Sequence, residues 1–379
     1  MEAEILRGAK IREAKGIWKQ AFGDDDGFID GYFKRRVPKG HVLGLSADEK
    51  LMSMLCTVPM RFKIRGGLIP AALITGVATR PEMRGKGHMA ALFEAALPKL
   101  RAMGFLMSYL HPEVLGFYEK FGYGYTASCT RCVITRDMLP VMNMKKSMLL
   151  EGSRAEKGAQ DVYWQAFNRN PCILQRRKKD WRFIMDDVKG DGGGCVLGID
   201  EKSAKAYAVW HGSSGEAKIT EAAWEDGDIL MDVLQRIFEN ARTERIDAVL
   251  PMKAVELFPT AQIQDFGMSR VIDMQALMQR MRVSADVRIK MKVGIYDGLL
   301  RWNDGVFQLV CSNGRAAIRR VEGRAAFECG IEGWAQLLCG YAKPSELIGK
   351  GKAAENEHGA AEVLDKIFPK KPCTCFETY

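Results

Sequence analysis

The stretch Arg84-Gly85-Lys86-Gly87-His88-Met89 lies between a strand-like and a helix-like segment. Residues 73–79 before it read as a short buried strand. A glycine-bearing turn at a helix N-terminus attracts anions, because free backbone N–H groups converge there and the helix dipole favours negative charge. Arg84 and Lys86 add positive charge, so the turn predicts a pyrophosphate site. The helix is indicated by apolar residues at helical spacing, which are Met89, Leu92, Phe93, Ala96, Leu97 and Leu100.

Two common phosphate motifs fit this turn poorly. The dinucleotide fingerprint needs a third glycine and an acidic residue about twenty positions on, and neither is present. The P-loop needs Ser or Thr after its lysine, where this chain has Gly87. An ordinary strand-turn-helix with solvated basic residues stays open on these residues alone.

Residues 77–87 resemble motif A of the GNAT acetyltransferases, which is a strand, a proline and an Arg-x-x-Gly turn. Phe117-Tyr118-Glu119-Lys120-Phe121-Gly122-Tyr123 is similar to the Phe-Tyr-x-x-x-Gly-Phe/Tyr ending of that superfamily. Met89 departs from the usual Gly or Ala, and this departure is shared by the enhanced-intracellular-survival (Eis) branch. Tyr118 in Tyr-x-x-Phe-Gly-Tyr-Gly also looks like that branch. The resemblance extends over nearly the whole chain and is strongest at 70–130.

The chain is too long for one core, and its patterns repeat. Residues 1–140 mix strands and helices, with a short helix expected around 114–120. Strand, helix and strand patterns recur after a boundary placed within 141–158. There 191–194 reads as a turn between strands and 271–279 as a strand. The fold class expected is α+β: tandem GNAT folds, with mixed sheets and flanking helices, followed by a sterol-carrier-protein-like α/β domain.

The resemblance implies a catalytic GNAT domain at 1–140, a second GNAT-like domain at 141–283 and the sterol-carrier-protein-like domain at 284–379. In the second copy, Trp224-Glu225-Asp226-Gly227-Asp228 stands where the basic turn would be. Carboxylates there would cap the helix and repel a pyrophosphate. We therefore expect the second domain to lack a cofactor motif.

The resemblance implies an N-acetyltransferase that uses acetyl-CoA as cosubstrate, without a metal. The acceptor would be an amine of a cationic molecule, such as an aminoglycoside-like polyamine or a lysine side chain. A non-catalytic acyl-CoA- or lipid-binding scaffold is the alternative. Cofactor contacts are assigned to Val77, Ala78, Thr79, Arg84, Gly85, Lys86, Gly87, His88, Met89, Ala90, Glu113 and Val114.

Tyr118 is the candidate acid that protonates the leaving thiolate, since its hydroxyl has a reference pKa of about 10. Tyr123 and Tyr125 compete for that role, and His111 is a rival base. In Eis-like enzymes the terminal carboxylate serves as the base, and Tyr379 holds that position here. Acceptor-pocket positions of that branch match Phe22, Asp24 and Phe33, with Trp18 adjacent.

The net charge of +9 comes from separate basic clusters, which are 34–36, 145–146, 176–179 and 319–320. A nucleic-acid binder more often shows one continuous basic stripe with interleaved aromatics, so we expect solvated faces and a polyanionic cofactor instead. No apolar run is long enough to span a bilayer, and the first residues do not resemble a signal peptide. These features predict a cytoplasmic protein without nucleic-acid or membrane partners.

The ten cysteines are expected to be mostly reduced, buried thiols. Cys129 and Cys132 have the spacing of metal ligands, but no second pair or nearby histidine completes a tetrahedral set. We therefore expect no metal site. The resemblance further implies a homo-oligomer, and specifically a homo-hexamer.

Overall fold

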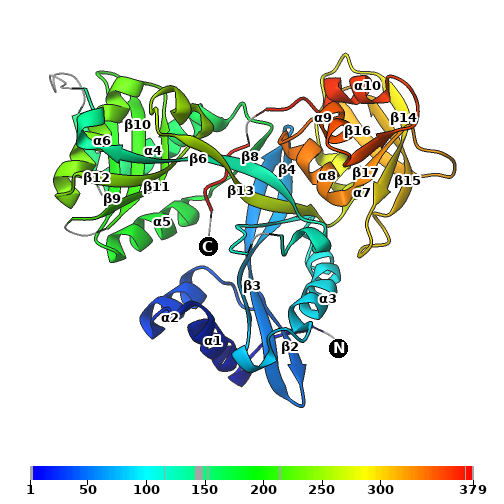
Figure 1. Cartoon of the computed structure of the whole chain (residues 1–379), viewed down its shortest axis with the longest axis horizontal. Coiled ribbons are helices and arrows are strands. Elements are labelled where there is room, and N and C mark those ends of the chain that lie inside the picture. Colours follow the sequence, from blue (N-terminus) through cyan, green and yellow to red (C-terminus); the bar gives the residue numbers. More distant parts are fainter. Residues whose placement is uncertain are drawn as a thin grey trace. The chain divides into compact units, whose positions relative to one another are not determined.

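The computed structural model describes residues 3–114, 116–140, 148–151, 153–212, 215–371 and 373–377. The chain forms two compact units, each built from separated segments. The first contains the residues before 127, residues 267–373 and Glu377, and the second contains 127–266 and 374–376. Figure 1 shows the strands and helices of both units, coloured from blue at the N-terminus to red at the C-terminus. Mixed sheets with helices confirm the predicted fold class.

The first unit begins with a sheet whose strands follow the order β1-β2-β3-β4-β5-β13, in which β13 is Gln262–Val271. β4 and β5 run parallel with helix α3 between them in sequence, and the end of β13 pairs antiparallel with β5 through residues 268–271. Its elements are β1 (Glu4–Ile5), α1 (Ala9–Phe22), α2 (Asp26–Arg35), β2 (Val42–Ala47), β3 (Lys50–Ile64), β4 (Gly67–Thr79), η1 (Pro81–Met83), α3 (His88–Ala102), β5 (Met107–Leu110) and η2 (Glu119–Phe121).

Strand β4 contains a bulge near its end. Met54 of β3 pairs with Ala78 and Cys56 with Thr75, so Gly76 and Val77 together face a single residue of β3. Gly76 has φ +57°, a value that glycine adopts without a steric cost. A Cβ on Gly76 would lie 2.1 Å from Cζ3 of Trp18, so the indole packs directly on the bulge.

Helix α3 forms because it buries one apolar face. Its buried residues are Leu92, Phe93, Ala96, Leu97 and Leu100, as their spacing predicts. Gly87 stands at the N-cap in the left-handed conformation and offers no side chain to the first turn.

The second unit repeats this plan with strand order β6-β12-β11-β10-β9-β7. β11 and β12 run parallel with helix α6 between them in sequence, and β6 pairs antiparallel with β12. The last strand of the first repeat, β6, therefore pairs with β12 in the second unit. The last strand of the second repeat, β13, pairs through its end with β5 in the first unit. The elements are β6 (Gly124–Thr135), η3 (Arg136–Met138), β7 (Met148–Glu151), α4 (Ser153–Phe167), β8 (Cys172–Leu174), α5 (Lys178–Gly190), β9 (Gly194–Ile199), β10 (Ala204–His211), β11 (Ala217–Trp224), α6 (Gly227–Ala241), β12 (Arg245–Leu250), η4 (Met252–Glu256) and β13 (Gln262–Val271).

The C-terminal part of the first unit is a separate five-stranded sheet of order β16-β15-β14-β17-β18. Arg65, in the β3–β4 hairpin, donates hydrogen bonds to the carbonyl oxygens of Leu337, Leu338 and Ile367 near the ends of two helices of this part. A cation suits the negative end of a helix dipole. The elements are α7 (Met274–Arg280), β14 (Ile289–Tyr296), β15 (Gly305–Ser312), β16 (Arg315–Arg320), β17 (Phe327–Gly330), α8 (Ile331–Cys339), α9 (Pro344–Gly349), β18 (Ala353–Glu355) and α10 (Ala360–Ile367).

Several local predictions were wrong. Residues 274–280 form helix α7 rather than a strand, because Asp273 caps the helix by accepting from the Ala276 N–H. Residues 191–194 follow helix α5, which the sequence analysis missed together with α4. The helix expected at 114–120 is only the short turn η2. The expected boundary lies partly at 141–147 and 152, outside the described residues, and the division at 140 and 283 stays a prediction.

Substituting Gly76 by alanine should destabilise the protein by about 2–5 kcal/mol. A left-handed backbone costs a non-glycine residue about 1–2 kcal/mol, and the clash with Trp18 adds about 1–3 kcal/mol. Gly104→Ala is the matched control, because Gly104 has φ +88° and no atom in the described part of the chain lies within 4 Å of the Cβ that an alanine would place there. Urea unfolding measures both. Equal losses for the two variants would contradict close packing of Trp18 on the bulge.

Candidate active site

The end of β4 and the start of α3 form a place where backbone groups are left open. β4 pairs with β5 only through residues 71–73 in the described chain, so residues 75–79 continue past the last pair with β5. Val77, Ala78 and Thr79 lie on this stretch. Such a separation of two parallel strands gives a ligand access to the backbone of β4.

The turn before α3 has the geometry of an anion site. Gly85 and Gly87 have φ +76° and +79°, and no atom of the described residues lies within 4 Å of the Cβ that either would carry. The first turn of α3 receives no hydrogen bond from its N-cap side chain. Its N–H groups and the helix dipole therefore remain available to an anion.

The basic side chains of this turn differ in their freedom. Arg84 and Lys86 are exposed, although Nε of Arg84 donates a 3.4 Å hydrogen bond to the Thr79 carbonyl. Arg80 is held in place, with its Nε 2.5 Å from the Leu51 carbonyl and an ion pair to Glu13. Arg84 and Lys86 are thus the cations able to reach a bound phosphate.

Helix α6 offers the opposite environment at the corresponding place of the second unit. The Asp226 carboxylate caps this helix by accepting hydrogen bonds from the N–H groups of Asp228 and Ile229, at 2.9 and 3.3 Å. The donors that an anion would need are occupied, and the capping group is negative. The predicted capping by a carboxylate is confirmed, and the loss of the anion site in the second repeat stays a prediction.

Tyr118 lies beside the open end of β4. It belongs to an apolar cluster that includes Phe93 of α3, and Val77, Met89 and Ala90 pack against the same cluster. Its ring makes edge contacts with Phe93, at a centroid distance of 5.8 Å. The hydroxyl group makes no hydrogen bond to the described part of the chain. The structure therefore brings the Tyr118 side chain together with residues predicted to contact the cofactor.

Burial and then the nearby Glu113 carboxylate raise the pKa of Tyr118 to about 12, because both disfavour the phenolate. The phenol keeps its proton at any physiological pH. Tyr123 is a weaker candidate for a proton donor, since its fully buried hydroxyl is already hydrogen-bonded to Oγ of Ser108 at 2.7 Å.

The residues predicted to line an acceptor pocket converge on Trp18. The indole Nε1–H donates to Oδ2 of Asp24 at 2.7 Å, and the rings of Phe22 and Phe33 lie 5.4 and 5.7 Å from the indole. Phe22 is 45% exposed. Because Trp18 also packs on Gly76, it links these predicted acceptor positions to the bulge beside residues 77–79.

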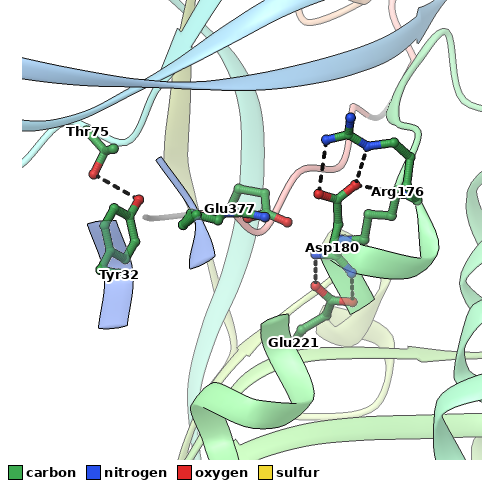
Figure 2. A network of polar contacts seen from close by, with 8 residues as sticks. Tyr32, Thr75, Arg176, Asp180, Glu221 and Glu377 are labelled. Atoms are coloured by element: carbon green, nitrogen blue, oxygen red, sulfur yellow. Dashed lines mark hydrogen bonds and ion pairs between the residues drawn. The ribbon is translucent and has the colours of Figure 1, made fainter. Parts of the chain in front are cut away.

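Glu377, near the end of the chain, is held inside the first unit. Its carboxylate forms a 2.6 Å ion pair with Arg36, and both side chains are almost fully buried. Tyr32, which packs beside Trp18, donates a hydrogen bond to Thr75 next to the bulge (Figure 2). Tyr379 itself lies outside the described residues.

Sequence reasoning missed some of these residues. The basic run 34–36 read as solvated, whereas Arg36 is buried and paired. Arg176, in another such run, is also buried. Gly76 could have been noticed, since a glycine inside a strand pattern often marks a bulge.

Two further predicted site residues lie after β5. Val114 is 61% exposed, and His111 is half-buried.

The cysteines are all buried, as predicted. Cys129 and Cys132 belong to different apolar clusters, in keeping with opposite faces of β6. Among the described residues no group of His, Cys, Asp and Glu side chains could hold a metal ion. No helix in the described ranges is long and apolar enough to cross a membrane.

Comparisons with known proteins agree with this geometry. Residues 3–126 match the family model of the acetyltransferase (GNAT) domain, and residues 274–376 match that of the sterol carrier protein domain. No curated protein has a sequence that matches the chain significantly.

Solved structures share the fold over the full chain. A GCN5-related N-acetyltransferase from Anabaena variabilis has a TM-score of 0.85 at 19% identity, covering 100% of both chains. One from Kribbella flavida has 0.82 at 17%, covering 100% of this chain and 98% of its own. Eis1 from Mycobacterium abscessus has 0.77 at 16%, covering 100% of both chains. The chain therefore carries a GNAT acetyltransferase domain at residues 3–126 and a sterol carrier protein domain at residues 274–376, and it shares its overall fold with these solved structures.

Proposed function

We propose that this protein transfers an acetyl group from acetyl-CoA to an amine of a cationic acceptor. GNAT enzymes use an acyl-CoA cosubstrate and act on amines. The observation that carries the proposal is the open N-terminus of α3 beside the end of β4 that no longer pairs with β5, with Tyr118 in an apolar cluster that both segments contact.

The cofactor's pyrophosphate would bind at the turn Arg84–Ala90, where backbone N–H groups and two cations converge. The backbone of Val77–Thr79 would then polarise the thioester carbonyl, because donors aimed at the developing oxyanion stabilise the transition state most. Glu113 and Val114 stay assigned to cofactor contact by resemblance. His88 begins the helix and follows the same turn in sequence.

The reaction requires a balanced movement of protons. The ammonium acceptor first loses a proton, and the neutral amine attacks the thioester carbon to form a C–N bond. The C–S bond then breaks, the thiolate takes the Tyr118 proton, and the amine nitrogen loses its second proton, which restores the phenol. The products are an amide and free CoA.

Proton transfer from Tyr118 to the thiolate is thermodynamically unfavourable at the pKa that Tyr118 has in the empty site. Its pKa of about 12 exceeds a thiol's reference of about 8.5, a difference of about 5 kcal/mol. The cationic nitrogen of the tetrahedral intermediate would stabilise the phenolate and reduce this cost. The transfer is therefore coupled to the presence of the charged intermediate.

The acceptor would bind near Trp18. Asp24 supplies a negative charge, and Phe22 and Phe33 supply aromatic faces, which attract ammonium groups. This combination favours polyamines or lysine side chains over anionic acceptors.

The terminal carboxylate of Tyr379 would serve as the base. The buried Arg36–Glu377 pair supports this proposal, because it holds the chain two residues before the terminus in the first unit. Burial raises the pKa of a carboxyl and makes it a better base. Hexameric assembly and a cytoplasmic location are part of the proposal on the resemblance alone.

Calorimetry should find one acetyl-CoA site per chain. Arg84→Glu should abolish binding, because it places a carboxylate beside the pyrophosphate. Asp226→Ala is the control, since it alters the corresponding helix start of the second repeat and should leave binding unchanged. Two sites of similar affinity would contradict the proposal, and binding without turnover on any amine would favour a scaffold.

Tyr118 should titrate near pH 12 rather than near 10. Folding raises its pKa, so the stability that it contributes is complete below pH 10 and is lost as pH rises towards 12. A phenolate absorbance titration of the wild type minus Tyr118→Phe measures this. A difference signal centred at pH 10 would show that the phenol is solvated.

Asp24→Ala should raise KM for a polyamine acceptor such as spermine by about tenfold, the scale of one lost charged hydrogen bond. KM for acetyl-CoA should not change. Asp30→Ala is the control, because Asp30 is an exposed partner of Lys15. A lower KM for an anionic acceptor in the wild type would contradict this pocket.

Removing Thr378 and Tyr379, or adding a C-terminal tag, should lower kcat by about 100-fold or more, the usual scale of general-base catalysis. Acetyl-CoA should still bind, because its proposed contacts lie elsewhere. An N-terminal tag is the control. Unchanged turnover in the tagged enzyme would return the role of base to His111 or to water.

A further inference from the structure

A buried ion pair lies directly behind the turn that carries Tyr118. Nη2 of Arg270 is 2.6 Å from Oδ1 of Asp297, and both side chains are 1% exposed. Arg270 comes from β13, and Asp297 follows β14, so neither residue belongs to the segment matched by the GNAT family model.

The other arm of Arg270 reaches the Tyr118 turn. Its Nη1 donates a 2.6 Å hydrogen bond to the carbonyl oxygen of Phe121. The Phe121 N–H in turn donates to the Tyr118 carbonyl at 3.0 Å. One guanidinium group therefore joins Asp297 to the backbone of the turn, three residues beyond Tyr118.

Gly122 allows this close approach. A Cβ there would lie 1.8 Å from Nη1 of Arg270, and the residue has φ +76°. Both the conformation and the contact exclude a side chain at this position. The glycine of the Phe-Gly-Tyr sequence is thus required by the arginine that packs on it.

Asp297 is fixed from several directions. Its Oδ1 accepts hydrogen bonds from the N–H groups of Leu299 and Leu300, both at 3.1 Å. Its Oδ2 accepts from the Asn303 amide at 3.1 Å. The carboxylate that orients Arg270 therefore has little freedom to move.

Stability is a poor explanation for this arrangement. Burying two charges costs desolvation energy, and apolar replacements of such pairs are often neutral or stabilising. Nε of Arg270 is also buried without a partner among the described residues. The pair is better explained by what it holds in place.

We propose that Arg270, oriented by Asp297, is a positioning residue that holds the Tyr118 turn so that the phenol can protonate the leaving group. The inference rests on the proposed role of Tyr118. It assigns part of the first domain's activity to segments after residue 266. A displacement of the turn by about 1 Å is enough to lower a rate about 100-fold.

The test is the double variant Arg270→Met/Asp297→Asn, which removes both charges and leaves no orphan carboxylate. The matched control is Arg176→Met/Glu221→Gln. This pair is also buried and bidentate, at 2.5 Å, but lies in the second unit (Figure 2). Each variant is assayed with acetyl-CoA and with its selenoester analogue, whose selenolate is a weaker base and needs less protonation.

With acetyl-CoA, Arg270→Met/Asp297→Asn should lose kcat at least tenfold, with KM for acetyl-CoA unchanged. The loss should shrink with the selenoester, as it should for Tyr118→Phe. Adding Tyr118→Phe to the double variant should cost little more, because the two changes remove one function. The control should show no dependence on the leaving group.

The inference would be overturned by equal losses of kcat with acetyl-CoA and the selenoester, or by additive effects with Tyr118→Phe. The same dependence on the leaving group in the control variant would also overturn it. Hydrogen exchange separates it from the proposed function. Backbone N–H groups of residues 119–123 should exchange faster in Arg270→Met/Asp297→Asn and not in the control variant. This result is expected even if Tyr118→Phe is fully active. In that case Tyr118 is not the acid, and the positioning role in catalysis fails although the turn is anchored. Unchanged exchange would contradict the anchoring itself.

Discussion

The separation of β4 from β5 after residue 73 is the constraint on which the candidate site depends. Two parallel strands that stayed paired would use the backbone donors of residues 75–79 within the sheet, and none would remain for a thioester. The bulge at Gly76 redirects the end of β4. It also lets Trp18 pack on the strand, so under the proposed function the same glycine would support both the cofactor site and the acceptor site.

The candidate site and the rest of the first unit are held together by residues far apart in sequence. Arg65 in the β3–β4 hairpin holds two helix ends of the C-terminal part, and Arg270 holds the Tyr118 turn. Arg36 pairs with Glu377. In each case a guanidinium group joins segments separated by more than a hundred residues. Arginine suits this role because its planar group can donate several hydrogen bonds in fixed directions. A GNAT domain cut at residue 126 would lose all three partners.

Local patterns were sufficient to predict helix α3 and the glycine turn before it. The helical spacing of Leu92, Phe93 and Ala96 fixed α3, and its glycine turn fixed the open N-terminus. The acidic start of α6 was also readable, since Asp226 caps its helix through residues two and three positions away. These features depend on neighbours in sequence.

Long-range features could not be read in this way. Arg36 and Arg176 stand in basic runs that are typical of solvated faces, and only the fold provides their buried carboxylates. Helix α7 was mistaken for a strand because 271–279 is short and apolar, which periodicity alone does not resolve. The exchange of last strands between the repeats depends on pairing across more than a hundred residues.

Hydrogen exchange with and without CoA tests the central claim most directly, because it reports on backbone N–H groups without requiring an acceptor. The account predicts slower exchange on binding at residues 75–79 and 85–91 and no change at 226–230. Protection at 226–230, or none at 75–79 while CoA is bound, would contradict the assignment of the site to the open end of β4.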